Sequence, residues 1–227
     1  MAYAFKQNLL PSSKYGIKAL YTMIPQYITV HNTANDASAA NEIKYMLSNN
    51  NEVSYHIAID DIEVIQGIPF NRNAWHCGDG KGTGNMKTIG VEICYSKSGG
   101  PRYAAAEENA VQYIAKLLKE FGWGIERVKQ HYDWSKKNCP HRIRAEGRWN
   151  SFLKRIEQAM KPVPITQPKE EPQVTNTLTS TAKQDLKDLL KETHKRGIMK
   201  VDHSGRVDRM TDSEALGLVI SVMKRTL

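Results

Sequence analysis

A proline-rich stretch between residues 161 and 178 most constrains how this chain can fold. Its sequence, KPVPITQPKEEPQVTNTL, contains four prolines and few side chains that could pack in a core. Stretches of this composition form semi-rigid linkers, because proline restricts the backbone and has no amide hydrogen to donate. The chain is therefore predicted to contain two separately folded parts, residues 1–160 and residues 179–227.

The first part alternates short apolar runs with helical patterns. Residues 1–25 contain two prolines and are expected to be an irregular arm. Runs rich in β-branched residues predict strands at residues 27–32, 53–60, 62–67, 88–95 and 125–129. Apolar residues at helical spacing predict helices at residues 36–49, 103–121 and 144–160. This order favours an α/β fold, with a hairpin at residues 53–67.

Residues 69–86 contain four glycines and no hydrophobic periodicity, so a long exposed loop is expected there. Loops of this length are uncommon unless they bind something. Trp75 and His76 could form a platform for a sugar or a peptide, or Trp75 could simply anchor the loop to the core. The glycine spacing does not match a nucleotide-binding turn between a strand and a helix.

The segment HYDWSKKNCPHR, residues 131–142, concentrates chemically reactive side chains in a stretch too polar for a core helix. His131 and Cys139 are spaced as in a loop that leaves a site and returns to it, and His31 could supply a third metal ligand. Three protein ligands leave a position open for water. Taken singly, such histidines and cysteines are more often structural, so the hypothesis depends on all three together.

Glu92 interrupts the otherwise apolar run TIGVEICY. A carboxylate inside a buried strand is unfavourable unless it is paired or hydrogen-bonded. This position makes Glu92 a candidate for acid/base catalysis with a raised pKa. The alternative is a glutamate that faces solvent from an edge strand.

The charge of the chain narrows the possible partners. A net charge of +8 and a pI near 9.3 favour an anionic partner, such as a nucleic acid, a membrane surface or an acidic cell-wall polymer. No basic run interleaved with aromatics points to nucleic acid, and no apolar stretch of about 20 residues predicts membrane insertion. The N-terminus lacks a signal-peptide pattern, so synthesis in the cytoplasm is expected. The three cysteines do not suggest a disulfide framework.

The part after the linker is predicted to form two helices. Leu186, Leu189 and Leu190 predict a helix that ends near Gly197. The tetrapeptide TDSE, residues 211–214, is a capping box that opens a second helix running through Leu216, Val219, Ile220 and Met223. A unit of about 50 residues buries little surface alone, so it is expected to dock or to pair with another copy. It has no catalytic set and is expected to be a binding appendage.

The motifs YITVHNT, VSYHIAID, TIGVEICY and HYDWSKKNCPH give residues 27–160 a specific resemblance to a known family. They resemble the zinc-dependent N-acetylmuramoyl-L-alanine amidases, a family shared by phage lysozyme-type amidases and peptidoglycan recognition proteins. The resemblance implies a central mixed β-sheet flanked by helices, with zinc at one edge, followed here by a small helical C-terminal domain that binds the cell wall.

Position by position, the resemblance implies roles for individual residues. The zinc ligands would be His31, His131 and Cys139, with His141 as the first substitute for Cys139. The catalytic residues would be Glu92, Lys137 and Tyr55. We also expect Trp75, Asn32 and Thr33 to bind substrate, and His56 and His76 to be structural.

The function implied by this resemblance is hydrolysis of the amide bond between N-acetylmuramic acid and L-alanine by zinc-activated water. The chain would act as a phage or prophage endolysin, reaching peptidoglycan and its anionic wall polymers after release from the host cytoplasm, and its C-terminal part could form a homodimer. One alternative is a recognition module that binds peptidoglycan without cutting it. Another is a glycosidase, which would need a second carboxylate beside Glu92.

Overall fold

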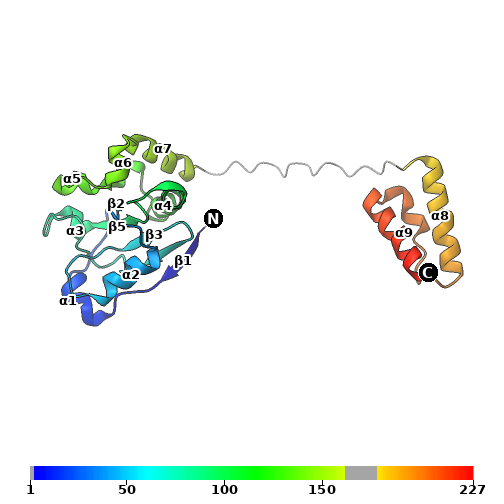
Figure 1. Cartoon of the computed structure of the whole chain (residues 1–227), viewed down its shortest axis with the longest axis horizontal. Coiled ribbons are helices and arrows are strands. Elements are labelled where there is room, and N and C mark those ends of the chain that lie inside the picture. The colour runs from blue at the N-terminus through cyan, green and yellow to red at the C-terminus, as the bar shows by residue number, and fades with distance from the viewer. Residues whose placement is uncertain (1–2, 162–177, 227) are drawn as a thin grey trace. The chain divides into compact units, whose positions relative to one another are not determined.

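The structure is a computed structural model that describes residues 3–161 and 178–226 (Figure 1). The chain divides into two compact units, Met1–Val163 and Pro164–Leu227, and each is described by itself. Except for residues 161 and 178, the predicted linker lies outside the described residues. The boundaries proposed for it therefore stay predictions.

The first unit is built on a mixed sheet of six strands within the described residues, in the order β1-β4-β3-β5-β2-β6. The β3–β4 hairpin is antiparallel, and the other neighbouring pairs are parallel. This arrangement confirms the predicted α/β class and its mixed sheet. The strands are β1 (Ala4–Gln7), β2 (Tyr27–Asn32), β3 (Ile57–Ile59), β4 (Glu63–Gln66), β5 (Thr88–Ile93) and β6 (Val128–Gln130).

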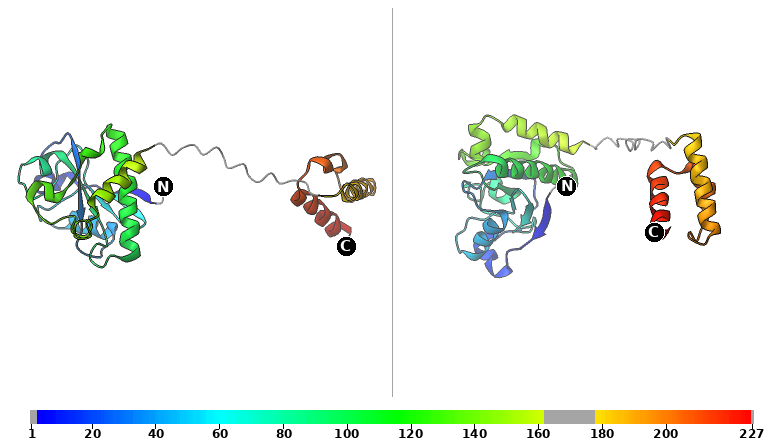
Figure 2. Two further views of the ribbon diagram at one scale, coloured as in Figure 1. Left: turned by 90° about the horizontal axis from the view of Figure 1, so that it is seen from above. Right: turned by 45° about the vertical axis from the view of Figure 1, so that its right-hand side comes forward.

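Helices cover both faces of this sheet, with α2 on one face and α4 on the other (Figures 1 and 2). Ser38 caps α2 by accepting a hydrogen bond from the Asn41 amide, and Gly122, in the left-handed conformation, ends α4. The helices are α1 (Tyr15–Lys18), α2 (Ala39–Ser48), α3 (Thr83–Lys87), α4 (Gly100–Phe121), α5 (His131–Ser135), α6 (His141–Ala145) and α7 (Trp149–Met160).

Strand alternation decides which side chains of the central strands meet which helix. In β2, Asn32 contacts Tyr103 of α4, so Ile28 and Val30 also face α4 and the core. His31 therefore points to the opposite face, where α2 lies. Its neighbour across the ladder is Glu92 of β5. This alternation separates an apolar core face from a polar face that carries the candidate site.

Two predictions for the N-terminal half of this unit are wrong. Residues 4–7 are not an irregular arm, because β1 pairs in parallel with β4 and Phe5 stacks on Tyr113 at 6.0 Å. In the VSYHIAID run only Ile57–Ile59 form a strand. Strand alternation would place Val53 on the same face as Ile57 and Ile59, but Val53 is 65% exposed, because the chain before Ile57 is not part of the strand.

Two later predictions are also corrected. Residues 69–86 are not an exposed loop: Asn73, His76 and Cys77 are buried, and α3 begins at Thr83. The single helix predicted at residues 144–160 is two helices, α6 and α7, interrupted at Gly147 in the left-handed conformation. In both regions tertiary packing overrides the structure that the local sequence pattern predicts.

Helix α7 is joined to α4 by a buried ion-pair network around Glu107. This carboxylate is 3% exposed and accepts hydrogen bonds from Arg148 at 2.7 and 3.0 Å and from Arg155 at 2.5 Å. Burial alone would raise the pKa of Glu107, but the bonds from the two arginines lower it below its usual value.

We expect Glu107→Gln to lower the free energy of unfolding by about 2–3 kcal/mol. Breaking one partner of a buried pair usually costs about 3–5 kcal/mol, and the partly exposed arginines can recover some hydration. Urea titrations can follow tryptophan fluorescence, since all four tryptophans lie before residue 150. The control is Glu108→Gln, an exposed partner of Arg155, where a loss under about 1 kcal/mol is expected. Equal losses in the two variants would contradict the prediction.

The second unit consists of α8 (Ser180–Lys195), a 3-10 turn at Ser204–Arg209 and α9 (Asp212–Thr226). The predicted capping box is formed: the Thr211 amide donates to Glu214 Oε2 at 2.7 Å, and the Glu214 amide donates to Thr211 Oγ1 at 3.2 Å. The core is small and contains Leu186, Leu190, Met199, Val207, Met210, Ala215 and Val222.

Helix α9 buries only part of its apolar surface. Leu216, Ile220 and Met223 are 60%, 43% and 55% exposed, whereas Ala215 and Val222 are buried. In so small a unit, α9 packs along one narrow face, and the rest of its apolar surface stays in solvent. Among the helices of residues 3–161 and 178–226, none is long and apolar enough to cross a bilayer.

Candidate metal and active site

The candidate site lies where three parallel strands end at the same edge of the sheet. His31 is the next-to-last residue of β2, and Glu92 occupies the same level of the neighbouring strand β5. His131 follows β6 directly as the first residue of α5. The chain then returns, and Cys139 comes back to the same point. Ligand sites in α/β proteins commonly form at such carboxyl ends.

The three predicted metal ligands are brought together by this arrangement. His31 Nδ1 lies 3.1 Å from His131 Nδ1 and 3.7 Å from Cys139 Sγ. Metal bonds of about 2.0–2.3 Å in a tetrahedral site place ligand atoms roughly 3.3–3.7 Å apart. The sulfur distance is within this range, and the nitrogen distance is slightly shorter, so small shifts would accommodate one ion. A cavity of about 290 Å³ is lined by the three residues and leaves room for a further ligand. The donor set therefore suits a single metal ion with an open position.

The two imidazoles of this group are ready to bind a metal ion, whereas the thiol must first lose its proton. Burial, followed by the nearby His76 and His131, lowers the pKa of His31 well below its usual value. Burial also lowers the pKa of His131, so both imidazoles are neutral and offer lone pairs. Burial raises the pKa of the Cys139 thiol to about 12 in the metal-free protein. Metal binding must therefore displace the thiol proton.

Glu92 is the carboxylate nearest this group in the sheet. Burial, followed by the charge of Glu42, raises the pKa of Glu92 to about 8, as expected for a carboxylate in a buried strand. Its Oε2 is buried and has no hydrogen-bond partner among the described residues. The side chain lines the same cavity as the three metal donors. Glu92 is thus a half-buried carboxyl group at the open site, and one of its oxygens is buried without a partner among the described residues.

Tyr55 lies in the cavity next to that of the metal donors. It is 6% exposed and lines a neighbouring cavity of about 530 Å³ that also contains Glu92. Its hydroxyl donates to Glu42 Oε2 at 3.1 Å, and Asn35 donates to Glu42 Oε1 at 2.6 Å. Burial and the charge of Glu42 raise the pKa of Tyr55, so its proton is retained. Sequence reasoning missed Glu42, because a glutamate on a helix surface looks like an ordinary solvated residue.

Lys137 lines the cavity of the metal donors, and its side chain is exposed to solvent. Its position is set by the tight turn before Cys139, in which the Cys139 amide donates to the Lys137 carbonyl at 2.7 Å. The preceding Lys136 has the left-handed conformation and stacks on Tyr132 instead. Of the two adjacent ammonium groups, the turn directs Lys137 toward the site.

The three predicted substrate contacts have different surroundings. The Asn32 side chain accepts from the Arg142 amide at 3.0 Å and faces Tyr103, while its backbone amide donates to Cys139 Sγ. Asn32 thus holds the returning loop in place. Thr33 lines both cavities around Glu92, and its buried hydroxyl has no partner within the described part of the chain. Trp75 lines a third cavity of about 450 Å³.

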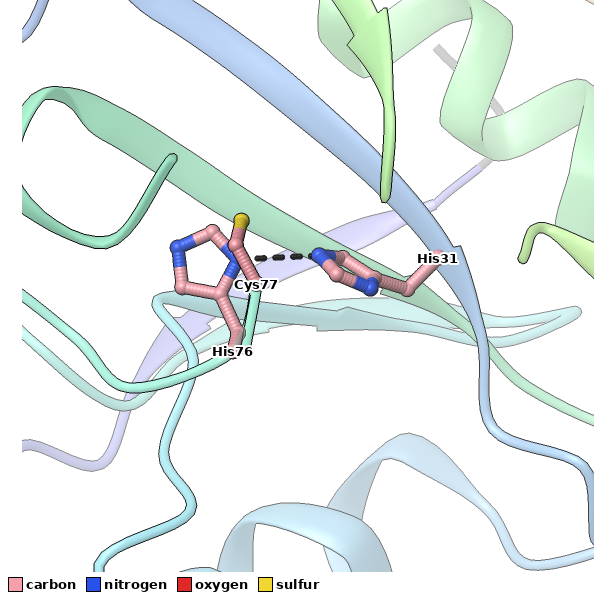
Figure 3. A group of neighbouring side chains, drawn as sticks. All are labelled: His31, His76 and Cys77. Carbon is pink, nitrogen blue, oxygen red and sulfur yellow. Dashed lines mark hydrogen bonds between the residues drawn. The ribbon is translucent and has the colours of Figure 1, made fainter. Parts of the chain in front are cut away.

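The remaining histidines of the first unit, His56, His141 and His76, have different surroundings. His56 binds the Gly90 amide and the Arg72 carbonyl, both at 2.9 Å, which agrees with a structural role. His141 lines the cavity and begins α6. His76, also expected to be structural, lies against His31 (Figure 3), with its Nδ1 2.9 Å from His31 Nε2, whereas His131 is next to His31 Nδ1.

The fold is that of a mixed α/β protein, and its His–His–Cys group could hold a metal ion beside a cavity. The sequence profile of the N-acetylmuramoyl-L-alanine amidases matches residues 21–142, which is more than half of the chain. The chain therefore belongs to the N-acetylmuramoyl-L-alanine amidase family, as its motifs predicted.

Individual relatives agree with this assignment. The chain is 60% identical over 161 residues to N-acetylmuramoyl-L-alanine amidase XlyB of Bacillus subtilis (strain 168), covering 70% of this chain and 51% of XlyB. It is 61% identical over 162 residues to N-acetylmuramoyl-L-alanine amidase CwlA of the same organism, covering 71% of this chain and 60% of CwlA. The alignments thus span only about half to three-fifths of these curated relatives.

Solved structures show the same fold. The structure of PlyL has 57% sequence identity and a TM-score of 0.66, covering 67% of this chain and 96% of that chain. The solution structure of the PlyG catalytic domain has 55% identity and a TM-score of 0.67, covering 71% of this chain and 98% of that chain. The similarity corresponds in extent to the first unit.

Proposed function

We propose that this chain is a zinc-dependent hydrolase that cleaves the amide bond between N-acetylmuramic acid and L-alanine in peptidoglycan. The observation that carries the proposal is the group of His31, His131 and Cys139 beside Glu92, whose Oε2 is buried without a partner among the described residues, in a member of the amidase family. Two imidazoles and a thiolate suit zinc, which accepts nitrogen and sulfur ligands in tetrahedral geometry.

In this proposal each residue at the site has a separate task. A bound zinc ion would supply Lewis-acid polarisation and lower the pKa of water. Glu92 accepts the proton of the attacking water and passes it to the departing amine of L-alanine. Lys137 donates to the oxygen that becomes negative as the carbonyl is attacked. Tyr55 holds Glu42 in the adjoining cavity and lines the path of the substrate.

The cavities around the site suit a polymeric substrate. The cavity with Tyr55 shares Glu92 and Thr33 with the central one, and the cavity with Trp75 shares His131 and Lys137 with it. The three adjoin and give a substrate room on both sides of the metal donors. We propose that glycan and stem peptide extend in the two directions, with Trp75 and Thr33 as contacts.

The second unit is proposed to bind the cell wall and to assist an endolysin in lysing its host. The chain carries a net charge of +8, which favours association with anionic wall polymers over long distances. We further propose that the exposed Leu216, Ile220 and Met223 of α9 allow two copies to pair. Sedimentation equilibrium of the full chain tests pairing: a monomer at all concentrations would exclude it. No role with nucleic acid or inside a membrane is proposed, and release from the host cytoplasm is expected to precede action on the wall.

Mass spectrometry of the soluble products from purified peptidoglycan tests the reaction, with a chelator-treated sample as the control. Stem peptides with free L-alanine amino termini, no new reducing sugar ends and loss of activity on chelation are expected. New reducing ends would instead establish a glycosidase. Intact peptidoglycan that retains the protein would indicate the non-catalytic recognition module.

We expect Lys137→Ala to reduce turnover by about 10²–10³-fold, the usual effect of removing one donor to a developing oxyanion. Zinc content should be unchanged, because Lys137 contributes no ligand atom. Rates of peptidoglycan hydrolysis and metal analysis of the same sample provide the test. Lys136→Asn is the matched control, because asparagine tolerates the left-handed conformation at this position and Lys136 faces Tyr132. A similar loss in both variants would show a general charge effect.

A further inference from the structure

The second ring nitrogen of His31 has a partner that the proposed mechanism does not use. His31 Nδ1 faces His131 and Cys139, whereas His31 Nε2 lies 2.9 Å from His76 Nδ1 (Figure 3). A neutral imidazole carries one N–H and one lone pair. Only one tautomer of His31 can therefore bind a metal through Nδ1: the one in which Nε2 carries the hydrogen.

The hydrogen bonds around His76 determine which ring donates. The Thr88 hydroxyl donates its single hydrogen to the Gly84 carbonyl at 2.6 Å, so it can only accept from its other neighbours. Thr29 is one of these, with its hydroxyl donating to Thr88 at 2.8 Å. His76 Nε2 is another, at 3.5 Å, and is thereby assigned as a donor. His76 Nδ1 is left with its lone pair and accepts the N–H of His31 at 2.9 Å. The other neighbour of this nitrogen is Cys77 Sγ at 3.1 Å, a weaker thiol donor.

Close packing leaves the His76 ring little freedom. A single oxygen, Asn85 Oδ1, accepts from the backbone amides of both His76 and Cys77, at 2.8 and 2.7 Å. The ring lies over Gly90, where an added Cβ would come within 2.8 Å of His76 Nδ1. Glycine at position 90 thus makes room for this histidine beside His31. The side chain is 7% exposed, so water does not replace the contact freely.

We propose that His76 is a positioning residue that accepts the Nε2–H of His31 and so keeps His31 Nδ1 available to a metal ion. The inference rests on the proposed function, since it assumes that His31 is a ligand. Partners of this kind orient metal-binding histidines, and their loss typically lowers metal affinity by about 10–100-fold. His76 would thus contribute to the site without touching the metal.

The same residues allow a different interpretation, in which His31, His76 and Cys77 hold a second ion. Their donor atoms also lie within 4.8 Å of one another. However, Cys77 is 0% exposed, whereas the group of His31, His131 and Cys139 lines a cavity. With both sites filled, His31 would have to lose both ring protons. The positioning role does not require this unfavourable step.

The test compares His76→Leu with His76→Asn in the full chain. Leucine removes the acceptor, whereas the asparagine side chain carries an amide oxygen near the position of imidazole Nδ1. Nitrogen-15 NMR of the metal-free proteins reports the His31 tautomer, and competition with a chelator measures zinc affinity. We expect His76→Leu to mix the His31 tautomers and to weaken zinc binding by about 10–100-fold, and His76→Asn to restore most of both.

His56→Leu is the matched control, because His56 is a buried neighbour of His76 that does not contact His31. It should lower stability but leave the tautomer and the zinc affinity unchanged. If His76→Leu does not fold, Thr88→Val keeps His76 but removes the acceptor of its Nε2–H, and mixed His31 tautomers are again expected.

An unchanged His31 tautomer in the folded His76→Leu or Thr88→Val protein would overturn the positioning role. So would two zinc ions per wild-type chain that fall to one in Cys77→Ala, since that result would establish the second site. A wild-type protein that binds no zinc would refute the proposed function instead. The tautomer measurement uses metal-free protein and would still decide the hydrogen-bond assignment, so the two failures are distinguishable.

Discussion

Cys139→Ser is expected to remove the metal ion and to abolish peptidoglycan hydrolysis at the same time. Zinc binds a thiolate strongly, and a neutral serine hydroxyl is a poor substitute. The remaining donors, His31 and His131, are too few to hold the ion in a site that needs three protein ligands. Loss of His131 by His131→Ala should have the same effect. Metal analysis of the purified variants and the product assay on peptidoglycan give the two readouts.

Cys94→Ala is the control for this prediction, because Cys94 is also a free, buried cysteine but belongs to the core. It should keep zinc and activity. A Cys139→Ser protein that retained one zinc ion and full turnover would show that Cys139 is not a ligand. His141, which lines the same cavity, would then be the first substitute to examine by adding His141→Ala.

Glu92→Gln is expected to retain zinc and to lose about 10²–10⁴-fold in turnover, the usual contribution of a positioned acid/base residue. Glutamine keeps the size of the side chain but cannot accept the proton of water. Glu63→Gln is the control, since Glu63 is a buried carboxylate of the same sheet that binds Lys6 and does not line the cavity. Full turnover in a zinc-loaded Glu92→Gln protein would exclude the acid/base role.

The same substitution has a second expected effect, on the stability of the metal-free protein. The pKa of Glu92 rises from 4.5 in the unfolded chain to about 8 in the folded one. Between these values the folded state holds a proton that the unfolded state has released, so stability falls as pH rises. Glutamine has no such dependence. The melting temperature of metal-free Glu92→Gln should therefore exceed that of wild type by a margin that grows from pH 5 to pH 8.

Absence of this growing margin would show that Glu92 is ionised in the folded, metal-free protein at neutral pH. Its presence would show that the fold tolerates an unfavourable buried carboxyl group at this point. Such groups are retained where they serve a reaction rather than stability. The pH-dependent melting curves thus test, without any substrate, whether the environment of Glu92 is suited to catalysis.

Several features of the fold were predictable because their causes are local. The strand at Tyr27–Asn32 and the helix that ends at Gly122 follow from β-branched residues, helical spacing and a left-handed stop. The capping box at Thr211 is equally local. β1 was missed because an edge strand depends on hydrogen bonds to its neighbour, which leave no hydrophobic pattern. The exposed face of α9 was missed because periodicity shows that a helix is amphipathic but not how much of that surface finds a partner.

The sequence by itself determined the chemical groups of the site and the family to which the chain belongs. His31, Glu92, His131 and Cys139 stand in short motifs with strand or loop character that are readable residue by residue. Only the tertiary structure decided that Tyr55 pairs with Glu42 and that His76 contacts His31 across 45 positions. The reason is physical: residue type and local pattern are encoded along the chain, whereas strand order and the direction of each side chain arise from long-range pairing and packing.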